Sequence, residues 1–117
     1  MEVQIFGVRK SADTRKAQRF FAERRIRTHF VDLHERDISD GELQRFIQKF
    51  GVEALVDRES SRFDELGMRH AQITSSRWIE KLLSEPTLLR LPLVRRLGKP
   101  EGLSIGLAEE VWKEWVR

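Results

Sequence analysis

The 117-residue sequence contains no cysteine. This absence excludes disulfides, thiolate metal sites and cysteine nucleophiles together. It says little about the cellular compartment, because a cytosolic fold does not need cysteine. The histidines His29, His34 and His70 lack metal-ligand spacing with nearby carboxylates, so we expect no metal site.

Long apolar runs are also missing. The first six residues end at Gly7 and basic residues follow, so no secretory signal core forms, and no later stretch is long enough to span a membrane. We therefore expect a cytoplasmic protein without membrane contact. The lack of a long exposed apolar run also favours a monomer. The composition, 39% hydrophobic and 35% charged, fits one compact domain over residues 1–117.

Positive charge exceeds negative charge by three, and basic residues concentrate between Arg9 and Arg27. This segment has two interpretations, a nucleic-acid-binding face or a solvated helix face. No aromatic residues interleave with the cations for base stacking, which favours the solvated face. We predict no direct contact with nucleic acid.

The first third of the chain has the pattern of a strand, a helix and a second strand. "EVQIF" predicts a strand buried on both sides, ended by Gly7. Ala17, Phe20 and Phe21 form the apolar stripe of a helix that ends near Arg25. "IRTHFVDL" predicts the second strand.

The rest of the chain predicts a helical block, a hairpin and a last helix. Ser39 and Glu42 form a capping box, and Gly51 ends that helix. "SSRFDELGM" and "TSSRWIEKLLSEP" predict two further helices, and "RLPLVRRLGKPEGLSIGL" predicts two strands joined by a turn. In the final helix we expect a buried stripe and a Glu109–Lys113 pair. The predicted stripe is Ala108, Val111 and Trp115.

Three segments carry a resemblance to a known family: "IFGVRKSADTRKA", "GVEALVDRESSRFDELGM" and "EPTLLRLPLVRRLGKPEGLSIGL". In order and spacing the chain resembles the arsenate reductase (ArsC) and Spx family. The resemblance implies an α/β (α+β) fold of the thioredoxin-like type. It also implies a helical insertion at about residues 38–90, between the N-terminal strand-helix-strand unit and the C-terminal hairpin plus helix.

The resemblance also locates the family's reactive positions. The redox cysteine is replaced by Ser11, and a second cysteine of some members is replaced by Thr14. The family's oxyanion-binding arginines are replaced by Asp57, by Leu91 and by a residue near Ile105 or Gly106. A serine oxygen cannot perform thiol redox steps, and no histidine is close in sequence to activate it. We therefore predict no catalytic residue.

The turn before the first helix can still bind a ligand. An anion or glutathione site would use the amides at the helix start together with side chains of the turn. The candidates are Arg9, Lys10, Ser11 and Thr14. The alternative is that Ser11 or Asp13 simply caps the helix. The Asp13 carboxylate also competes with an anion for the same field.

Two further positions are candidates for binding a partner. Pro92 matches the proline that thioredoxin-like domains commonly hold in cis, where the preceding backbone can bind an extended peptide. The alternative is a proline that opens an edge strand. Gly51 aligns with a glycine on the surface by which Spx-like regulators contact the RNA polymerase alpha subunit, and helix termination explains the same glycine.

From this resemblance the predicted function is that of a redox-inactive ArsC/Spx-like protein, a protein-binding or transcription-regulatory module rather than an enzyme. Its predicted partner is a protein, with the RNA polymerase alpha subunit as the candidate, and it needs no cofactor. The alternative is an arsenate reductase-like oxidoreductase that binds glutathione or an oxyanion.

Overall fold

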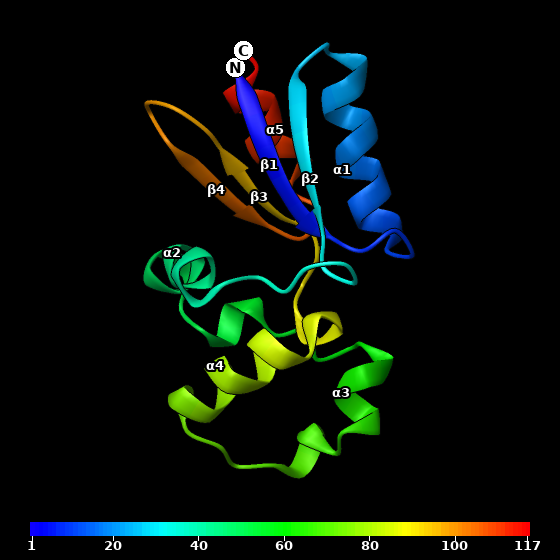
Figure 1. The fold of residues 1–117 in the computed structure, drawn as a ribbon, viewed down its shortest axis with the longest axis vertical. Helices are drawn as coiled ribbons and strands as arrows, with labels where there is room; N and C mark the ends of the chain where they lie inside the picture. Colours follow the sequence, from blue (N-terminus) through cyan, green and yellow to red (C-terminus); the bar gives the residue numbers. More distant parts are fainter. The chain divides into compact units, whose positions relative to one another are not determined.

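The computed structural model describes residues 1–117 and contains a four-stranded mixed sheet (Figure 1). The strands are β1 (Glu2–Gly7), β2 (Arg27–Asp32), β3 (Leu93–Arg96) and β4 (Gly102–Ile105), in the spatial order β2-β1-β3-β4. β1 runs parallel to β2 and antiparallel to β3, and β3 is antiparallel to β4. The fold is α/β and thioredoxin-like, as the sequence predicts.

The chain forms two compact units. The first consists of residues 1–36 and 91–117 and holds the sheet, α1 (Ala12–Glu23) and α5 (Glu109–Trp115). The second, residues 37–90, is helical. It contains α2 (Asp40–Phe50), α3 (Ser61–Glu65), α4 (Ser75–Ser84) and short 3-10 helices at Glu53–Leu55, Met68–His70 and Pro86–Leu88. None of the helices combines the length and the apolar content needed to cross a membrane.

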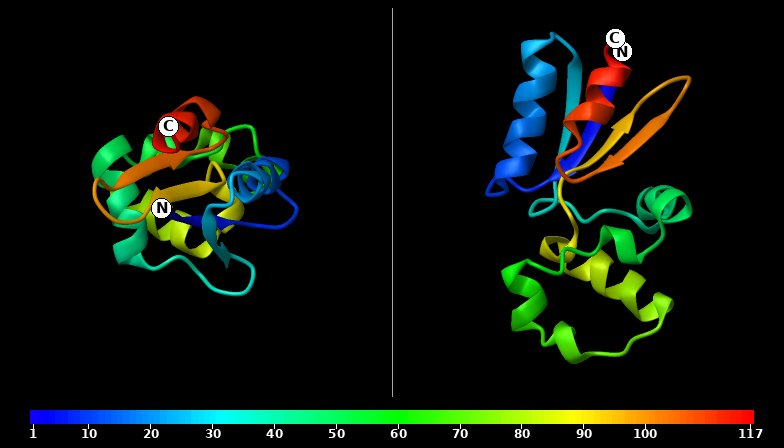
Figure 2. Two further views of the ribbon diagram at one scale, coloured as in Figure 1. Left: turned by 90° about the horizontal axis from the view of Figure 1, so that it is seen from above. Right: turned by 180° about the vertical axis from the view of Figure 1, so that it is seen from behind.

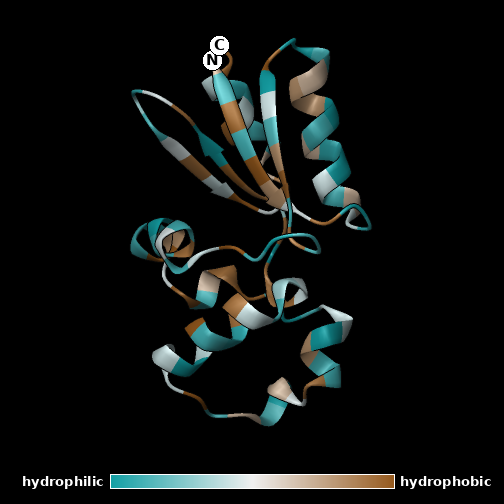
Figure 3. Ribbon diagram, in the orientation of Figure 1, coloured by the Kyte–Doolittle hydropathy of each residue, from teal (hydrophilic) through white to brown (hydrophobic).

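In the sheet unit, α1 and α5 cover the same face of the sheet (Figure 2). The helix stripe predicted for α1 is confirmed, since Ala17, Phe20 and Phe21 are buried. The rings of Phe20 and Phe21 each lie 5.5 Å from the Trp112 ring of α5. Figure 3 shows the ribbon of α1 coloured mostly as hydrophilic. The apolar cluster consists of Val3, Ile5, Ala17, Phe20, Phe21, Val94 and Trp112.

The stripe predicted for the final helix is partly wrong. Val111 is 41% exposed, whereas Trp112 is fully buried. Two overlapping apolar stripes compete on α5, and the one that places the large Trp112 indole in the core removes more apolar area from water. The predicted ion pair is also displaced by one residue, because Lys113 Nζ contacts Glu110 at 3.2 Å rather than Glu109.

A buried hydrogen bond holds α5 on the sheet. The Trp112 indole N–H donates to Ser104 Oγ of β4 at 2.8 Å, and both residues are buried. Ser104→Ala leaves this donor without a partner, so we expect the free energy of unfolding to fall by about 1–3 kcal/mol. Urea unfolding followed by tryptophan fluorescence measures the loss. Ser84→Ala, at an exposed serine, is the control and should change stability little; equal losses in both variants would contradict the role of the hydrogen bond.

The helical unit is capped as the sequence predicts. Ser39 Oγ accepts from the Glu42 amide at 3.1 Å, and the Glu42 carboxylate accepts from the Ser39 amide at 2.9 Å. Ser60 and Thr74 cap α3 and α4. Gly51 follows α2 with a φ of +84°, a value that an L side chain adopts only with strain. The unit has its own buried residues, among them the stacked rings of Phe63 and Trp78, 6.4 Å apart.

A bidentate ion pair joins α3 to the end of α4. Arg62 Nε and Nη2 donate to the two carboxylate oxygens of Glu85, both at 2.9 Å. These hydrogen bonds lower the pKa of the Glu85 carboxyl below its ordinary value, and partial desolvation opposes them.

The lowered pKa of Glu85 makes stability depend on pH. A carboxyl with a lower pKa in the folded state stabilises the fold above its unfolded pKa, and this contribution is lost as the pH falls through the folded value. Glu85→Gln should therefore lower the urea midpoint near pH 7 and change it less near pH 3. Glu80→Gln, at a more exposed carboxylate of α4, is the matched control. Equal losses at both pH values would rule out this linkage.

Candidate functional site

Ser11, in the turn between β1 and α1, and Thr14, in the first turn of α1, are the positions to which the resemblance assigns the family's cysteines. The Ser11 amide donates to the Val8 carbonyl at 3.1 Å, and Ser11 Oγ accepts from the Thr14 amide at 3.1 Å. Ser11 is therefore the N-cap of α1, one of the two alternatives that the sequence left open. Its oxygen has no base among its hydrogen-bond partners, so the geometry does not activate it as a nucleophile.

Thr14 lies one helical turn further on and is completely buried. Its hydroxyl Oγ1 has no hydrogen-bond partner. The side chain packs directly on Gly7, because a Cβ added to Gly7 would lie 2.5 Å from both Oγ1 and Cγ2 of Thr14. The Thr14 hydroxyl is thus enclosed between α1 and β1, away from any anion at the surface of the turn.

Arg9 is held by an acid at the end of the neighbouring strand. Its Nε donates to Asp32 Oδ2 at 3.2 Å, and Asp32 Oδ1 accepts from the His34 amide at 2.9 Å. Arg15 also donates to the Arg9 carbonyl at 2.7 Å. Of the two cations proposed for an anion site, only the exposed Lys10 is left without an ionic or hydrogen-bond partner.

The position of Asp32 is a feature that the sequence interpretation missed. β1 and β2 are parallel, and their register pairs Gly7 with Asp32. The carboxyl ends of parallel strands lie at the same edge of a sheet, so an acid that ends the second strand lies beside the turn that follows the first. The signal in the sequence is Asp32, the acidic residue just before the last position of "IRTHFVDL".

The loop before β3 lies next to the same turn. Phe6 pairs with Leu93, and continuing this antiparallel register by one residue places Pro92 opposite Gly7. The Leu91–Pro92 peptide bond is cis. The Pro92 carbonyl accepts from the Gly106 amide at 2.9 Å, whereas the backbone N–H and C=O of Leu91 make no hydrogen bond. Leu91 thus offers a free donor and a free acceptor beside the turn.

The positions at which the resemblance implies the family's arginines hold no guanidinium group. Asp57 lies in the helical unit, where its Oδ1 accepts from the Glu59 amide at 3.0 Å and its own amide donates to Leu88 at 2.7 Å. The Asp57 side chain therefore organises the local turn. Gly106, with a φ of +67°, shapes the chain after β4.

Comparison with protein families gives a match that covers nearly the whole chain. The sequence profile of the ArsC family matches residues 6–115. The chain belongs to the ArsC family. It has the arsenate reductase-like fold of this family but none of the cysteine on which thiol reduction depends.

Solved structures support the fold. The YffB protein has 19% sequence identity to this chain and a TM-score of 0.85, with 98% of this chain and 99% of that chain covered. An arsenate reductase from Vibrio cholerae has 23% identity and a TM-score of 0.70, with coverage of 86% and 92%. An arsenate reductase (ArsC) related protein from Brucella melitensis has 22% identity and a TM-score of 0.71, with coverage of 100% and 96%. The search of curated proteins found no match.

Proposed function

We propose that this ArsC-family protein is a redox-inactive module that binds a protein partner. One observation carries the proposal: the hydroxyls at both of the family's cysteine positions have structural roles. Ser11 caps α1, and Thr14 is buried against Gly7. A thiol reductase needs a thiolate that attacks a disulfide or an oxyanion adduct, and neither oxygen can replace it.

The turn retains features that suit an extended peptide. The free N–H and C=O of Leu91 can pair with a peptide backbone in the manner of an added strand. Lys10 supplies an exposed positive charge in the β1–α1 turn, and α1 adds the exposed cations Lys16 and Arg19. These charges favour a partner segment with acidic residues and make its association sensitive to salt.

Within this proposal the partner is the RNA polymerase alpha subunit, and the protein acts as an Spx-like regulator that lacks a redox switch. Shape and charge are sufficient for such a contact, since no thiol takes part in it. Gly51 is the candidate contact in the helical unit.

A binding measurement with the C-terminal domain of the alpha subunit tests this partner. We expect saturable binding that Lys10→Glu weakens by about tenfold, a change of about 1.4 kcal/mol. Lys99→Glu makes the same charge change at an exposed position of the β3–β4 turn and should leave binding unchanged. Binding no stronger than that of a charge-matched unrelated protein would refute the polymerase assignment, and equal effects of the two variants would refute the role of the turn.

A second candidate function rests on Lys10, whose ammonium is unpaired at the start of α1. An anionic ligand such as glutathione could place a carboxylate there, close to the helix amides. The engagement of Arg9 by Asp32 and the burial of Thr14 both weaken this candidate. Titration calorimetry with glutathione, arsenate and sulfate separates the two, because a dissociation constant below about 1 mM for any of them would favour the ligand-binding function.

A further inference from the structure

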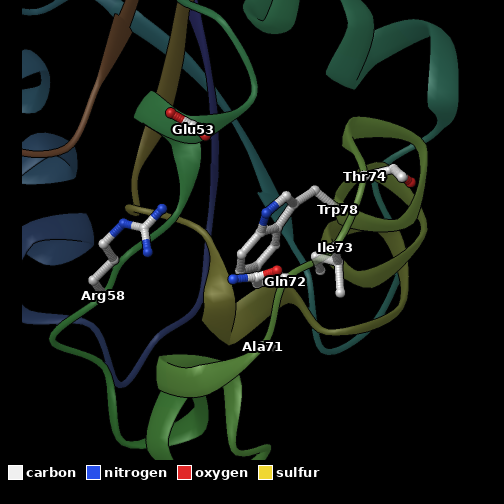
Figure 4. Close-up of a pocket in the computed structure, with 7 residues that line it drawn as sticks. All are labelled: Glu53, Arg58, Ala71, Gln72, Ile73, Thr74 and Trp78. Carbon is white, nitrogen blue, oxygen red and sulfur yellow. The ribbon is translucent and has the colours of Figure 1, made fainter.

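The helical unit contains a surface pocket that has no part in the proposed function. Its volume is about 470 Å³, within the range of small-molecule sites. The pocket is formed by the segment that follows α2 and by the chain that enters α4 (Figure 4). Its polar lining includes Glu53, Arg58 and Gln72, and its apolar lining includes Ala71, Ile73 and the Trp78 ring.

Two hydrogen-bond donors in this pocket have no partner in the protein. Arg58 makes no hydrogen bond or ion pair, and its Cζ lies 6.0 Å from the Trp78 ring and 5.7 Å from the Phe63 ring. Figure 4 shows its guanidinium directed toward Trp78. Trp78 is only 6% exposed, yet its indole N–H is neither hydrogen-bonded nor enclosed. This N–H is therefore accessible at the surface, and the ring that carries it lines the pocket.

The two buried tryptophans, Trp78 and Trp112, differ in the hydrogen bonding of the indole N–H. Trp112 has its N–H satisfied by Ser104. A nearly buried indole usually finds a partner for its N–H, and the Trp78 N–H is a free donor that a ligand acceptor can satisfy. Arg58 beside it presents a planar set of donors that suits a carboxylate.

The negative charge of Glu53 in the pocket further restricts which charged groups the ligand can carry. Glu53 is exposed and forms no ion pair with Arg58 or with any other cation. A simple anion would meet repulsion from Glu53, and a simple cation would meet repulsion from Arg58. A ligand that carries an ammonium group and a carboxylate satisfies both residues.

We propose that this pocket binds a free α-amino acid with an apolar side chain. The ligand carboxylate pairs with Arg58 and accepts from the Trp78 indole, its ammonium group faces Glu53, and its side chain lies against Ala71 and Ile73. The proposal does not depend on the partner of the β1–α1 turn, since all lining residues belong to residues 37–90.

An NMR titration of the full chain with leucine tests this inference. Each of the three tryptophans has one indole N–H to observe, and a Trp78→Phe variant identifies the signal of Trp78. We expect this signal to shift saturably, with half-saturation below about 5 mM, while the Trp112 signal stays in place. N-acetylleucine and leucinamide, which each lack one charge, should bind at least about tenfold more weakly. Inorganic phosphate is the probe for a simple anion site.

Exposed variants complete the test without threatening the fold. Arg58→Gln should weaken leucine binding by about tenfold or more, whereas Arg77→Gln, at an exposed arginine of α4 outside the pocket, should not. Glu53→Gln should remove the preference for leucine over N-acetylleucine. The inference is overturned if leucine leaves the Trp78 signal unshifted up to about 10 mM, if Arg58→Gln binds as tightly as the natural chain, or if phosphate binds more tightly than leucine.

Discussion

Gly7→Ala is expected to destabilise the protein by about 3 kcal/mol. The added Cβ would lie 2.5 Å from Oγ1 and Cγ2 of Thr14, and 3.1 Å from its Cβ. Thr14 is a short β-branched residue that is fully buried on α1, so its side chain cannot swing aside. The new methyl group can be accommodated only if α1 moves away from β1, which opens the apolar cluster beneath the helix.

The double variant Gly7→Ala/Thr14→Ala makes this prediction specific. Alanine at position 14 removes both atoms of the closest clash, so the double variant should be more stable than Gly7→Ala alone by at least about 1 kcal/mol. Gly41→Ala is the control, because no atom lies within 4 Å of its added Cβ in α2, and it should leave stability unchanged or raise it. Urea unfolding of the four proteins supplies the comparison. A Gly7→Ala variant as stable as the natural chain would show that Thr14 does not pack there as described.

Ser11→Cys is expected to create a thiol far more reactive than an ordinary exposed one. Ser11 is the N-cap of α1, with its side-chain atom 3.1 Å from the Thr14 amide. A thiolate at this position receives the positive end of the helix dipole and the charge of Lys10, both of which lower its pKa below the ordinary value of about 8.5. The Asp13 carboxylate in the first turn of α1 acts in the opposite sense and reduces this lowering.

The rate of alkylation as a function of pH measures this thiol. Because the natural chain has no cysteine, the introduced thiol is the only one in the protein. Ser84→Cys places a thiol at the last residue of α4, where the helix dipole has the opposite sign. The Ser11→Cys thiol should titrate at least about one pH unit below the Ser84→Cys thiol. If the two titrate together, the turn has lost its electrostatic character as well as its cysteine.

Much of the fold follows from local patterns. The capping box at Ser39 and Glu42 and the alternation in "EVQIF" depend on neighbours within a few residues, so they predict element boundaries directly. The choice between Val111 and Trp112 on α5 depends on which stripe meets the sheet, and local spacing fits both. Tertiary packing decides between them, and the sequence interpretation chose the wrong stripe.

The site was predictable only in part for the same reason. The resemblance implies that Ser11 and Thr14 replace reactive residues, and the sequence interpretation places both hydroxyls in one candidate ligand site. The structure places the Thr14 hydroxyl against Gly7 of β1 and ties Arg9 to Asp32 of β2. Both contacts join residues that are separated along the chain, and the local patterns of a single sequence do not predict such tertiary contacts. The sequence does not predict the pocket at Arg58 and Trp78, because the lining residues form no motif.

The central claim, that this ArsC-family fold has no reductase chemistry of its own, is tested most directly by one activity comparison. Reduction of arsenate and of a model disulfide is measured for the natural chain and for Ser11→Cys/Thr14→Cys under the same conditions. The expected result is a natural chain without activity and a double variant that reduces the disulfide, because the turn keeps its helix N-terminus and needs only thiols. Turnover of either substrate by the natural chain would contradict the claim.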